Sequence, residues 1–399
     1  MKFIMFFVLL SICDVAFGQQ YYVKGYVNDS ITFKPIPYVN ISIKGFNRGT
    51  VSNGKGFFYF VFTQEELTDS LNISCVGYFS KSYLLQSING KEMVINIMPK
   101  IFELSEAIIR SKSPEELLRQ AIRNVPKKFS NDKSTQIALY KETICQYQNG
   151  DSLIRSIVAA VGINNLEFVD NKTRSNKKTL LYGVYKSEDN LMHYNNIYAR
   201  LPNLLRWTIE SNCLEYISDY NILNPKKNTK YLYRFFDSAM VGENNSKYVK
   251  IIISPKSFPS SLSEGAVYIN MADTVITRIE LFHSIRKMPR KEDNIYKNLD
   301  RVVYSIVEPT SLIVEYKKIR NKYFLSYISQ KIKIGDYYSD YLPFQFDSYE
   351  TELIIIGKDL LNRFKTTPVI IDKKSDLYYL TSINDKDFWD RFNFMIIQP

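Results

Sequence analysis

Histidine is scarce in this chain: only two occur among 399 residues, at positions 193 and 283. A histidine-based triad or a zinc site with several histidine ligands needs imidazole groups in contact, and neither His193 nor His283 has a glutamate at a ligand-like spacing. The sequence also lacks a Gly-x-Ser-x-Gly elbow and a phosphate-binding glycine-rich loop. We therefore predict no catalytic residue, no metal and no cofactor.

Long apolar runs are also missing after residue 18, so we expect no transmembrane helix in the mature chain, because a helix needs about 20 apolar residues to cross a bilayer. The one apolar run near the start, residues 3–12, follows Lys2 and precedes small residues. This pattern predicts a signal peptide over residues 1–18, with cleavage between Gly18 and Gln19. The mature protein is then exported, to the periplasm, the outer-membrane face or beyond the cell.

Cysteine is too rare to hold the fold together. Removal of the signal peptide leaves Cys75, Cys145 and Cys213, an odd number that allows at most one disulfide. Lipidation at Cys13 is disfavoured because Ile12 is bulkier than the small residue expected there. The fold must therefore rest on a hydrophobic core.

Glycine (15) and proline (14) are too few for a collagen-like or low-complexity protein, whereas 30 Tyr and 25 Phe favour half-buried strands. The net charge is +11. This charge would attract an anionic lipid or an acidic polysaccharide, or it reflects coding bias alone. Export removes nucleic acid as a partner. Three basic groups stand beside turn-forming residues, where we expect solvated hairpin tips: residues 172–178, 226–230 and 317–322.

The first hundred residues consist of short alternating runs separated by turn signals. Ser52 to Gly56 is a turn rich in residues that tolerate positive φ, and an aromatic run follows it. The runs are residues 21–28, 39–43, 57–62, 71–76, 83–85 and 93–98. Six or seven short strands in about 80 residues predict a seven-stranded antiparallel β-sandwich of transthyretin or immunoglobulin type.

A set of glycines, turn residues and aromatic residues in this region resembles the carboxypeptidase regulatory-like domain. Its members here are Gly25, Pro37, Gly45, Gly49, Asn53, Gly54, Gly56, Phe57, Gly77 and Tyr78. The resemblance covers residues 21–99 and implies a transthyretin-like sandwich, common in exported proteins of Gram-negative bacteria. The resemblance also implies an accessory domain rather than a peptidase, so these residues are expected to be structural. The predicted domain spans residues 19–99.

A linker and a helix follow the sandwich. Residues 100–112 are predicted to be an extended, partly docked linker, and residues 113–399 a β-rich second domain. Ser113 is a predicted N-cap, with Pro114 in the first turn and Glu116 three residues after the cap. We expect Pro126 to end the helix, because the residue before a proline avoids the α region.

Strands dominate the second domain, and the clearest are residues 247–254, 265–271, 274–284, 312–319 and 323–334. The last of them places Phe324, Ile328, Ile332 and Ile334 on one face. We predict an α+β domain in which a larger curved antiparallel sheet wraps over a helix. This arrangement is similar to the half-barrel of bacterial lipoprotein carriers, which implies either an apolar concavity for an acyl chain or a filled core. Residues 199–224 could begin a second helix, and residues 384–392 a third.

Two groups of acidic residues are spaced closely enough to suggest chemistry. Glu350 and Glu352 would share one face of a strand, at a spacing that glycoside hydrolysis could use. Asp385, Asp387 and Asp390 lack the 12-residue loop of a calcium site. Both groups are better interpreted as surface carboxylates.

We therefore predict a non-catalytic exported envelope protein that acts as a binding or scaffold module. Its partner, which the sequence does not specify, is an envelope protein, a glycan or a lipid. Two alternatives remain: a carrier that shelters a lipid or lipidated peptide in the second sheet, and a hydrolase of peptide or glycan that uses the Glu350/Glu352 pair.

Overall fold

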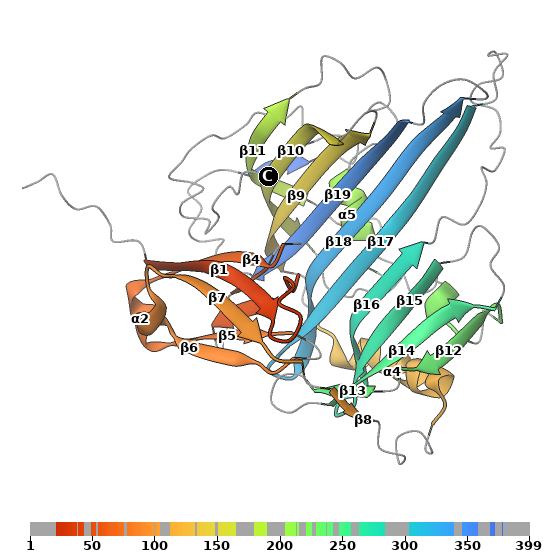
Figure 1. Ribbon diagram of the computed structural model, residues 1–399, viewed down its shortest axis with the longest axis horizontal. Coiled ribbons are helices and arrows are strands. Elements are labelled where there is room, and N and C mark those ends of the chain that lie inside the picture. Colours follow the sequence, from red (N-terminus) through yellow and green to blue (C-terminus); the bar gives the residue numbers. More distant parts are fainter. Residues whose placement is uncertain are drawn as a thin grey trace, which may run out of the picture.

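The computed structural model is a mainly β protein, with a sandwich followed by a larger antiparallel sheet and a few helices, as predicted (Figure 1). The predicted signal peptide, the predicted helix at 384–392, His193, Cys213 and the three aspartates at 385, 387 and 390 lie outside the described residues. The described residues are 21–37, 39–43, 49–52, 55–75, 78–99, 101–103, 112–131, 134–147, 151–164, 179–189, 204–212, 214, 221–225, 229–236, 238–241, 247–256, 263–283, 303–338, 345–357, 368–371 and 377.

The N-terminal sandwich contains seven strands among the described residues, which confirms the expected number. One sheet has the order β4-β1-β7 and the other the order β3-β2-β5-β6. The strands are β1 (Tyr21–Asp29), β2 (Asn40–Ile43), β3 (Gly49–Val51), β4 (Phe57–Phe62), β5 (Ser70–Ser74), β6 (Lys81–Leu84) and β7 (Glu92–Ile97). Two short helices, η1 (Gln64–Thr68) and α2 (Leu85–Ile88), lie between strands.

One strand pair of the sandwich corrects the expectation of a purely antiparallel arrangement. β1 and β7 are parallel, with Lys24 opposite Glu92 and Asp29 opposite Ile97. A parallel pair needs a long crossover connection, and here β2 to β6 all form before β7 pairs with β1. The remaining pairs are antiparallel.

The sandwich is held by alternating side chains from both sheets. Val23 and Val27 of β1 are fully buried, while Tyr26 between them is exposed. Ile41 of β2 and Phe58 of β4 face the same core. Because period-two alternation buries one face of each strand, the core follows directly from the sequence pattern.

Thirteen described strands form the large sheet, in the order β20-β11-β10-β9-β19-β18-β17-β16-β15-β14-β13-β8, with β12 also paired to β14. Every pair in it is antiparallel. The strands are β8 (Ile101–Glu103), β9 (Thr135–Tyr147), β10 (Asp151–Asn164), β11 (Thr179–Asp189), β12 (Tyr231–Phe235), β13 (Ser238–Val241), β14 (Lys247–Pro255), β15 (Ser263–Asn270), β16 (Val275–His283), β17 (Val303–Ile319), β18 (Lys322–Tyr338), β19 (Gln345–Gly357) and β20 (Val369–Ile371).

The segment predicted as a linker contributes a strand to this sheet. β8 pairs with β13, so the chain joins the edge of the large sheet directly after it leaves the sandwich. β12 and β13 pair with successive halves of β14. Backbone hydrogen bonds therefore tie the end of the sandwich to the second domain.

A β-bulge changes which side chains of β18 reach the core. Opposite β18, Glu315 pairs with Tyr327 but Tyr316 pairs with Leu325, which leaves one extra residue on β18. Leu325 and Ile328 both join the core as a result, whereas Phe324 lies on the other face. The prediction that Phe324 shares a face with Ile328 was wrong, because strict alternation assumes a strand without a bulge.

The predicted helix is α4 (Pro114–Lys128). The backbone N–H of Glu116 donates to the Ser113 side chain at 3.2 Å, so the predicted N-cap is confirmed. The predicted end was wrong, since Pro126 lies within the last turn and the N–H of Phe129 donates to the Val125 carbonyl at 3.0 Å. Phe129 is buried against the rings of Tyr316 and Tyr323, with ring centroids 5.1 and 5.7 Å away, and this packing holds the last turn.

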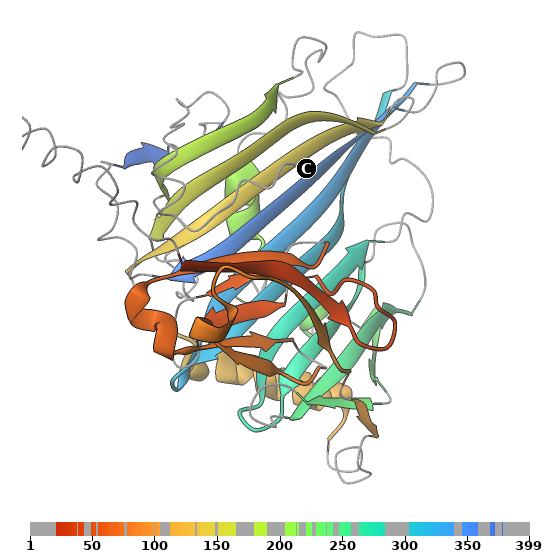
Figure 2. The same ribbon diagram turned by 60° about the vertical axis from the view of Figure 1, so that its left-hand side comes forward.

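The second helix is α5 (Leu204–Glu210), in the region that the sequence left ambiguous. α4 and α5 pack against one face of the large sheet, where their apolar residues join a continuous core. The sandwich lies on the opposite face, and β3 contacts β19. Figure 2 shows this layering, with the sandwich in front of the large sheet and the helices behind it. Each face of the sheet is therefore covered in part.

Candidate functional site

Tyr78 of the module's motif forms a hydrogen bond with Asp29 at the end of β1. The Tyr78 hydroxyl donates to Asp29 Oδ2 at 3.0 Å, and Asp29 Oδ1 accepts from the backbone N–H groups of Ile31 and Thr32, each at 2.8 Å. Burial raises the pKa of Asp29, but the hydrogen bonds outweigh it and hold that pKa below its usual range. Burial, followed by the contact with Asp29, raises the pKa of Tyr78. The pair joins the end of β1 to the segment that precedes β6.

The described glycines of the motif stand where a side chain has no room. A Cβ at Gly25 would lie 1.9 Å from the Met93 carbonyl oxygen, and one at Gly49 would lie 2.5 Å from that of Ile41. Gly56 has φ +76°, and its Cβ would lie 2.7 Å from the Val27 oxygen. Phe57 begins β4 and Pro37 is half-buried, whereas Gly45, Asn53, Gly54 and Gly77 lie outside the described residues.

A polar seam runs through the apolar core beneath α5. Thr208 Oγ1 lies 2.7 Å from Thr351 Oγ1 on β19, and Ser211 Oγ lies 3.3 Å from Gln330 Oε1 on β18. The Tyr316 hydroxyl on β17 donates to Asn212 Oδ1, and all six residues are buried. We call the six residues (Thr208, Ser211, Asn212, Tyr316, Gln330 and Thr351) the polar seam.

Apolar side chains surround the polar seam. Leu205 and Ile209 of α5 join the large core, and Leu204 packs with Ile332 and Tyr349. Buried hydrogen bonds contribute only about 1 kcal/mol each, yet they define position because an unmade bond is costly. The sheet therefore holds α5, a helix of only two turns, by specific polar contacts as well as by packing.

A second buried group, the arginine cluster, lies on the opposite face of the large sheet. It consists of Lys250, Tyr268, Arg278, Glu280 and Glu315, from four adjacent strands. Arg278 Nε donates to Glu280 Oε1 at 2.7 Å, and its Nη1 donates to Glu315 Oε1. The Tyr268 hydroxyl donates to Glu280 Oε2 at 3.1 Å, and Lys250 Nζ lies 3.8 Å from the same oxygen. Two cations thus balance two carboxylates.

The arginine cluster lies near Cys75, which directly follows β5 of the sandwich. Burial lowers the pKa of Arg278, but Glu315 and Glu280 raise it further, so this guanidinium stays charged. Burial raises the pKa of Glu315, and Arg278 opposes that rise. Each charged group of the cluster therefore has a partner of opposite charge within the large sheet.

The predicted carboxylate pair shares a face of β19 but does not share an environment. Glu350 is exposed and forms an ion pair with Lys331. Glu352 Oε1 accepts a hydrogen bond at 2.8 Å from Tyr327, which is fully buried. Burial raises the pKa of Glu352, although Lys141 and Tyr327 oppose the rise. Each carboxylate therefore already has a partner from the sheet.

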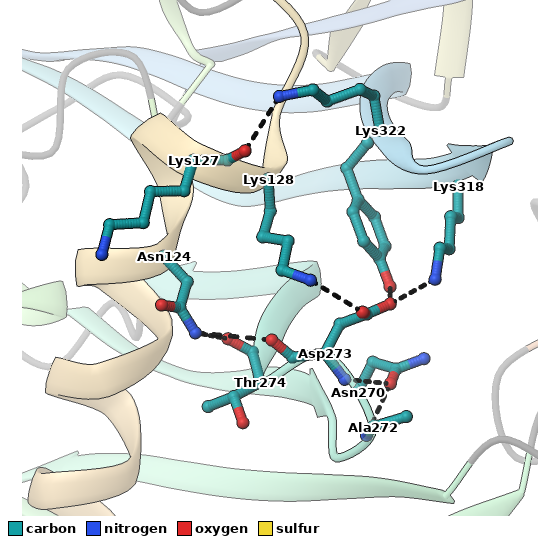
Figure 3. A network of polar contacts seen from close by, with 10 residues as sticks. Asn124, Lys127, Lys128, Asn270, Ala272, Asp273, Thr274, Lys318 and Lys322 are labelled. Atoms are coloured by element: carbon teal, nitrogen blue, oxygen red, sulfur yellow. Dashed lines mark hydrogen bonds and ion pairs between the residues drawn. The ribbon is translucent and has the colours of Figure 1, made fainter.

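Asp273 gathers side chains from three elements at one corner of the large sheet (Figure 3). It lies in the turn between β15 and β16, and it accepts from Lys128 of α4 at 3.1 Å, from Lys318 of β17 at 2.5 Å and from Tyr323 of β18 at 2.9 Å. Asn124 of α4 donates to the Thr274 carbonyl at 3.0 Å. Burial raises the pKa of Asp273, but the three donors dominate and lower it to about 2.

Sequence reasoning missed the arginine cluster and the polar seam. A signal was present in the sequence, because Arg278 and Glu280 interrupt an apolar strand at the alternating positions of one face. Their partner Glu315 lies on another strand, so only the strand register brings the three together. His283 ends β16 opposite Ser263. Among the described residues, no group of His, Cys, Asp and Glu could hold a metal ion, and no helix is long and apolar enough to cross a membrane.

Comparison with known families confirms the resemblance of the first domain. The family model of the CarboxypepD_reg-like domain matches residues 23–109. This match covers the sandwich and runs past the predicted boundary at residue 99, through β8. No curated protein matches the chain.

Several solved structures are weakly similar to the chain. A LolA superfamily protein from Nitrosomonas europaea is 8% identical, with a TM-score of 0.17, and the match covers 64% of this chain and 99% of that chain. A DUF1329 family protein from Desulfovibrio piger is 8% identical, with a TM-score of 0.21, and the match covers 64% of this chain and 100% of that chain. A chain of the MucA/MucB complex of Pseudomonas aeruginosa is 6% identical, with a TM-score of 0.19, and the match covers 65% of this chain and 99% of that chain. Likenesses this weak establish neither a shared fold nor a shared function.

Proposed function

We propose that the chain is an exported, non-catalytic binding protein of the cell envelope, in which the sandwich and the large sheet form one scaffold. One observation carries the proposal: each described carboxylate with a shifted pKa is held by a fixed partner within the fold. A catalytic acid or base must exchange its proton with a substrate, whereas these carboxylates are engaged by partners within the fold. The tie through β8 adds support, because it limits relative movement of the two domains.

Export and binding are tested separately. A reporter that is active only outside the cytoplasm, fused after residue 99, should be active with residues 1–18 and inactive without them. The mature chain, immobilised from Gln19, should then retain a defined envelope component that binds again after purification. An active reporter without residues 1–18, or a component that fails to bind again, would contradict the corresponding half of the proposal.

A carrier of lipid or lipidated peptide is the second candidate, and the polar seam favours it. Hydrogen bonds confine α5 to one place over an apolar sheet face, and hydrogen-bonded contacts can be exchanged for water when a helix lifts. In this candidate function, α5 is the cover of an acyl-chain site on the core face.

A reversible cross-link tests the carrier function. The hydroxyl oxygens of Thr208 and Thr351 lie 2.7 Å apart, so cysteines at both positions are close enough for a disulfide. In a background without the native cysteines, the oxidised Thr208→Cys/Thr351→Cys variant should take up no fluorescent fatty acid, and reductant should restore uptake. The single variant Thr208→Cys is the control. It cannot form the cross-link, so it should take up the fatty acid equally under oxidising and reducing conditions. Equal uptake in the oxidised and reduced double variant would exclude α5 as the cover.

A further inference from the structure

The corner at Asp273 brings together two basic groups that are far apart in the sequence. The last turn of α4 carries Lys127 and Lys128, and the β17–β18 hairpin carries four more basic residues within residues 317–322. Together with the β15–β16 turn, these segments hold six basic residues and one acidic residue, Asp273. Lys317 alternates with Lys318 and lies on the other face of β17, so we call the other five basic residues (Lys127, Lys128, Lys318, Arg320 and Lys322) the basic corner.

Hydrogen bonds fix the geometry of the basic corner. Lys322 Nζ donates to the Lys127 carbonyl oxygen at 2.9 Å, which joins the hairpin to the C-terminal end of α4 (Figure 3). Lys128 and Lys318 share the carboxylate of Asp273. Because one carboxylate balances only one of these two charges, the five basic residues and Asp273 together carry a net charge of +4.

Most of this charge faces solvent. Lys127, Lys318, Arg320 and Lys322 are exposed, and Lys128 is half-buried. Arg320 has φ +54°, a left-handed conformation that is uncommon for a residue other than glycine. The turn thus carries Arg320 at its tip.

We propose that the basic corner is a docking surface for an anionic membrane, which it contacts through the phosphate groups of the lipids. Charge complementarity carries the proposal: lysine binds phosphate as a point charge, and a cluster of lysines and arginines is attracted to anionic lipid. Sugar recognition would need exposed aromatic rings for stacking, but the aromatic side chains described at this corner, Phe129 and Tyr323, are buried. The inference is independent of which ligand the protein binds.

Vesicle binding of the mature chain tests the proposal. The protein should sediment with vesicles of phosphatidylcholine mixed with phosphatidylglycerol, but not with phosphatidylcholine alone. Salt at ~1 M should release it, because the screening length falls to about 3 Å. Absence of binding to the anionic vesicles, or binding that salt does not weaken, would overturn the proposal.

A charge-matched pair of variants locates the contact. Lys127→Gln/Arg320→Asn removes two charges from the corner, and asparagine tolerates the left-handed backbone at position 320. We expect binding to weaken by about fivefold per charge removed, or about 25-fold in total. Lys81→Gln/Lys91→Gln removes two charges from exposed positions of the sandwich and should bind like the unaltered chain. Equal weakening of both variants would assign the effect to net charge and overturn the proposal.

Two further measurements complete the test. Lysine acylation of the unaltered chain should show protection of Lys127 and Lys322 by anionic vesicles and not by neutral vesicles, which needs no variant to fold. Soluble polygalacturonate serves as an anionic competitor without a membrane. Corner-dependent binding to polygalacturonate in the absence of vesicle binding would identify an acidic polysaccharide and reject the membrane.

Discussion

Arg278 on β16 lies directly opposite Glu315 on β17, and its guanidinium donates a hydrogen bond to that carboxylate on the face that the sandwich covers. Both side chains are largely buried, at 13% and 16% exposed. A charge that loses its partner in such a place is costly. We expect Arg278→Met to lower the free energy of unfolding by about 3–5 kcal/mol, measured by denaturant titration.

The matched control is the exposed pair of Arg206 and Glu210 on α5. Arg206→Ala should cost about 0.5 kcal/mol or less, since solvent screens that pair. Glu315→Leu added to Arg278→Met should recover part of the loss, because it removes one of the stranded carboxylates. Similar losses for Arg278→Met and Arg206→Ala would contradict a buried cluster.

Asp273 should make stability depend on pH in acid. Its pKa in the folded protein is about 2, below the value of about 4 in an unfolded chain, so its contribution is complete above pH 4. That contribution, about 2 kcal/mol, should be lost as the pH falls from about 4 to about 2. Unfolding free energies measured across this window should fall less steeply for Asp273→Asn than for the unaltered chain. The same slope in both would show that the three donors do not stabilise the Asp273 carboxylate.

Three glycines of the sandwich should respond differently to alanine. Gly25→Ala places a Cβ 1.9 Å from the Met93 oxygen and should cost about 3 kcal/mol or more, because β1 and β7 must separate. Gly56→Ala combines a contact at 2.7 Å with a positive φ and should also destabilise strongly. Gly90 has φ +70° but no atom within 4 Å of its Cβ, so Gly90→Ala should cost only about 1–2 kcal/mol. In thermal melts, Gly25→Ala and Gly56→Ala should therefore lower the melting temperature more than Gly90→Ala does.

Glu352→Gln should stabilise the protein at pH 7. Burial raises the pKa of Glu352 in the folded protein above its value in the unfolded chain. The deprotonated carboxylate therefore destabilises the folded state at pH 7, whereas below the unfolded pKa the carboxyl is protonated in both states and has no such effect. Glutamine carries no charge and can still accept from Tyr327. The gain should therefore disappear in titrations near pH 4. A loss of stability at pH 7 would mean that Lys141 contributes more to Glu352 than burial costs.

The same residues test the proposed lack of catalysis. Glu350→Gln/Glu352→Gln should leave unchanged whatever rate the mature chain shows on a panel of peptides and glycans. The control Lys331→Gln keeps both carboxylates and removes only the ion pair with Glu350. A rate that falls in the double variant and persists in the control would revive the hydrolase.

Local features of the sequence predicted much of the fold. Ser113 and Pro114 marked the start of α4, because a cap needs only neighbouring residues. The alternating runs predicted six of the seven strands of the sandwich, all except β3, and the glycine and aromatic motif predicted its family. The sequence did not predict the polar seam. The Glu350/Glu352 pair, which it suggested instead, lies apart from the polar seam.

By itself, the sequence determined most strand faces, the N-cap of α4 and the glycine positions, because each depends on residues within a few positions of one another. Tertiary structure alone decided the parallel pairing of β1 with β7, the bulge that moves Phe324 off the core face, and the meeting of Arg278 with Glu315. These features depend on which distant strands pair and in what register. Register is set by the packing of the whole sheet, and no local pattern specifies it.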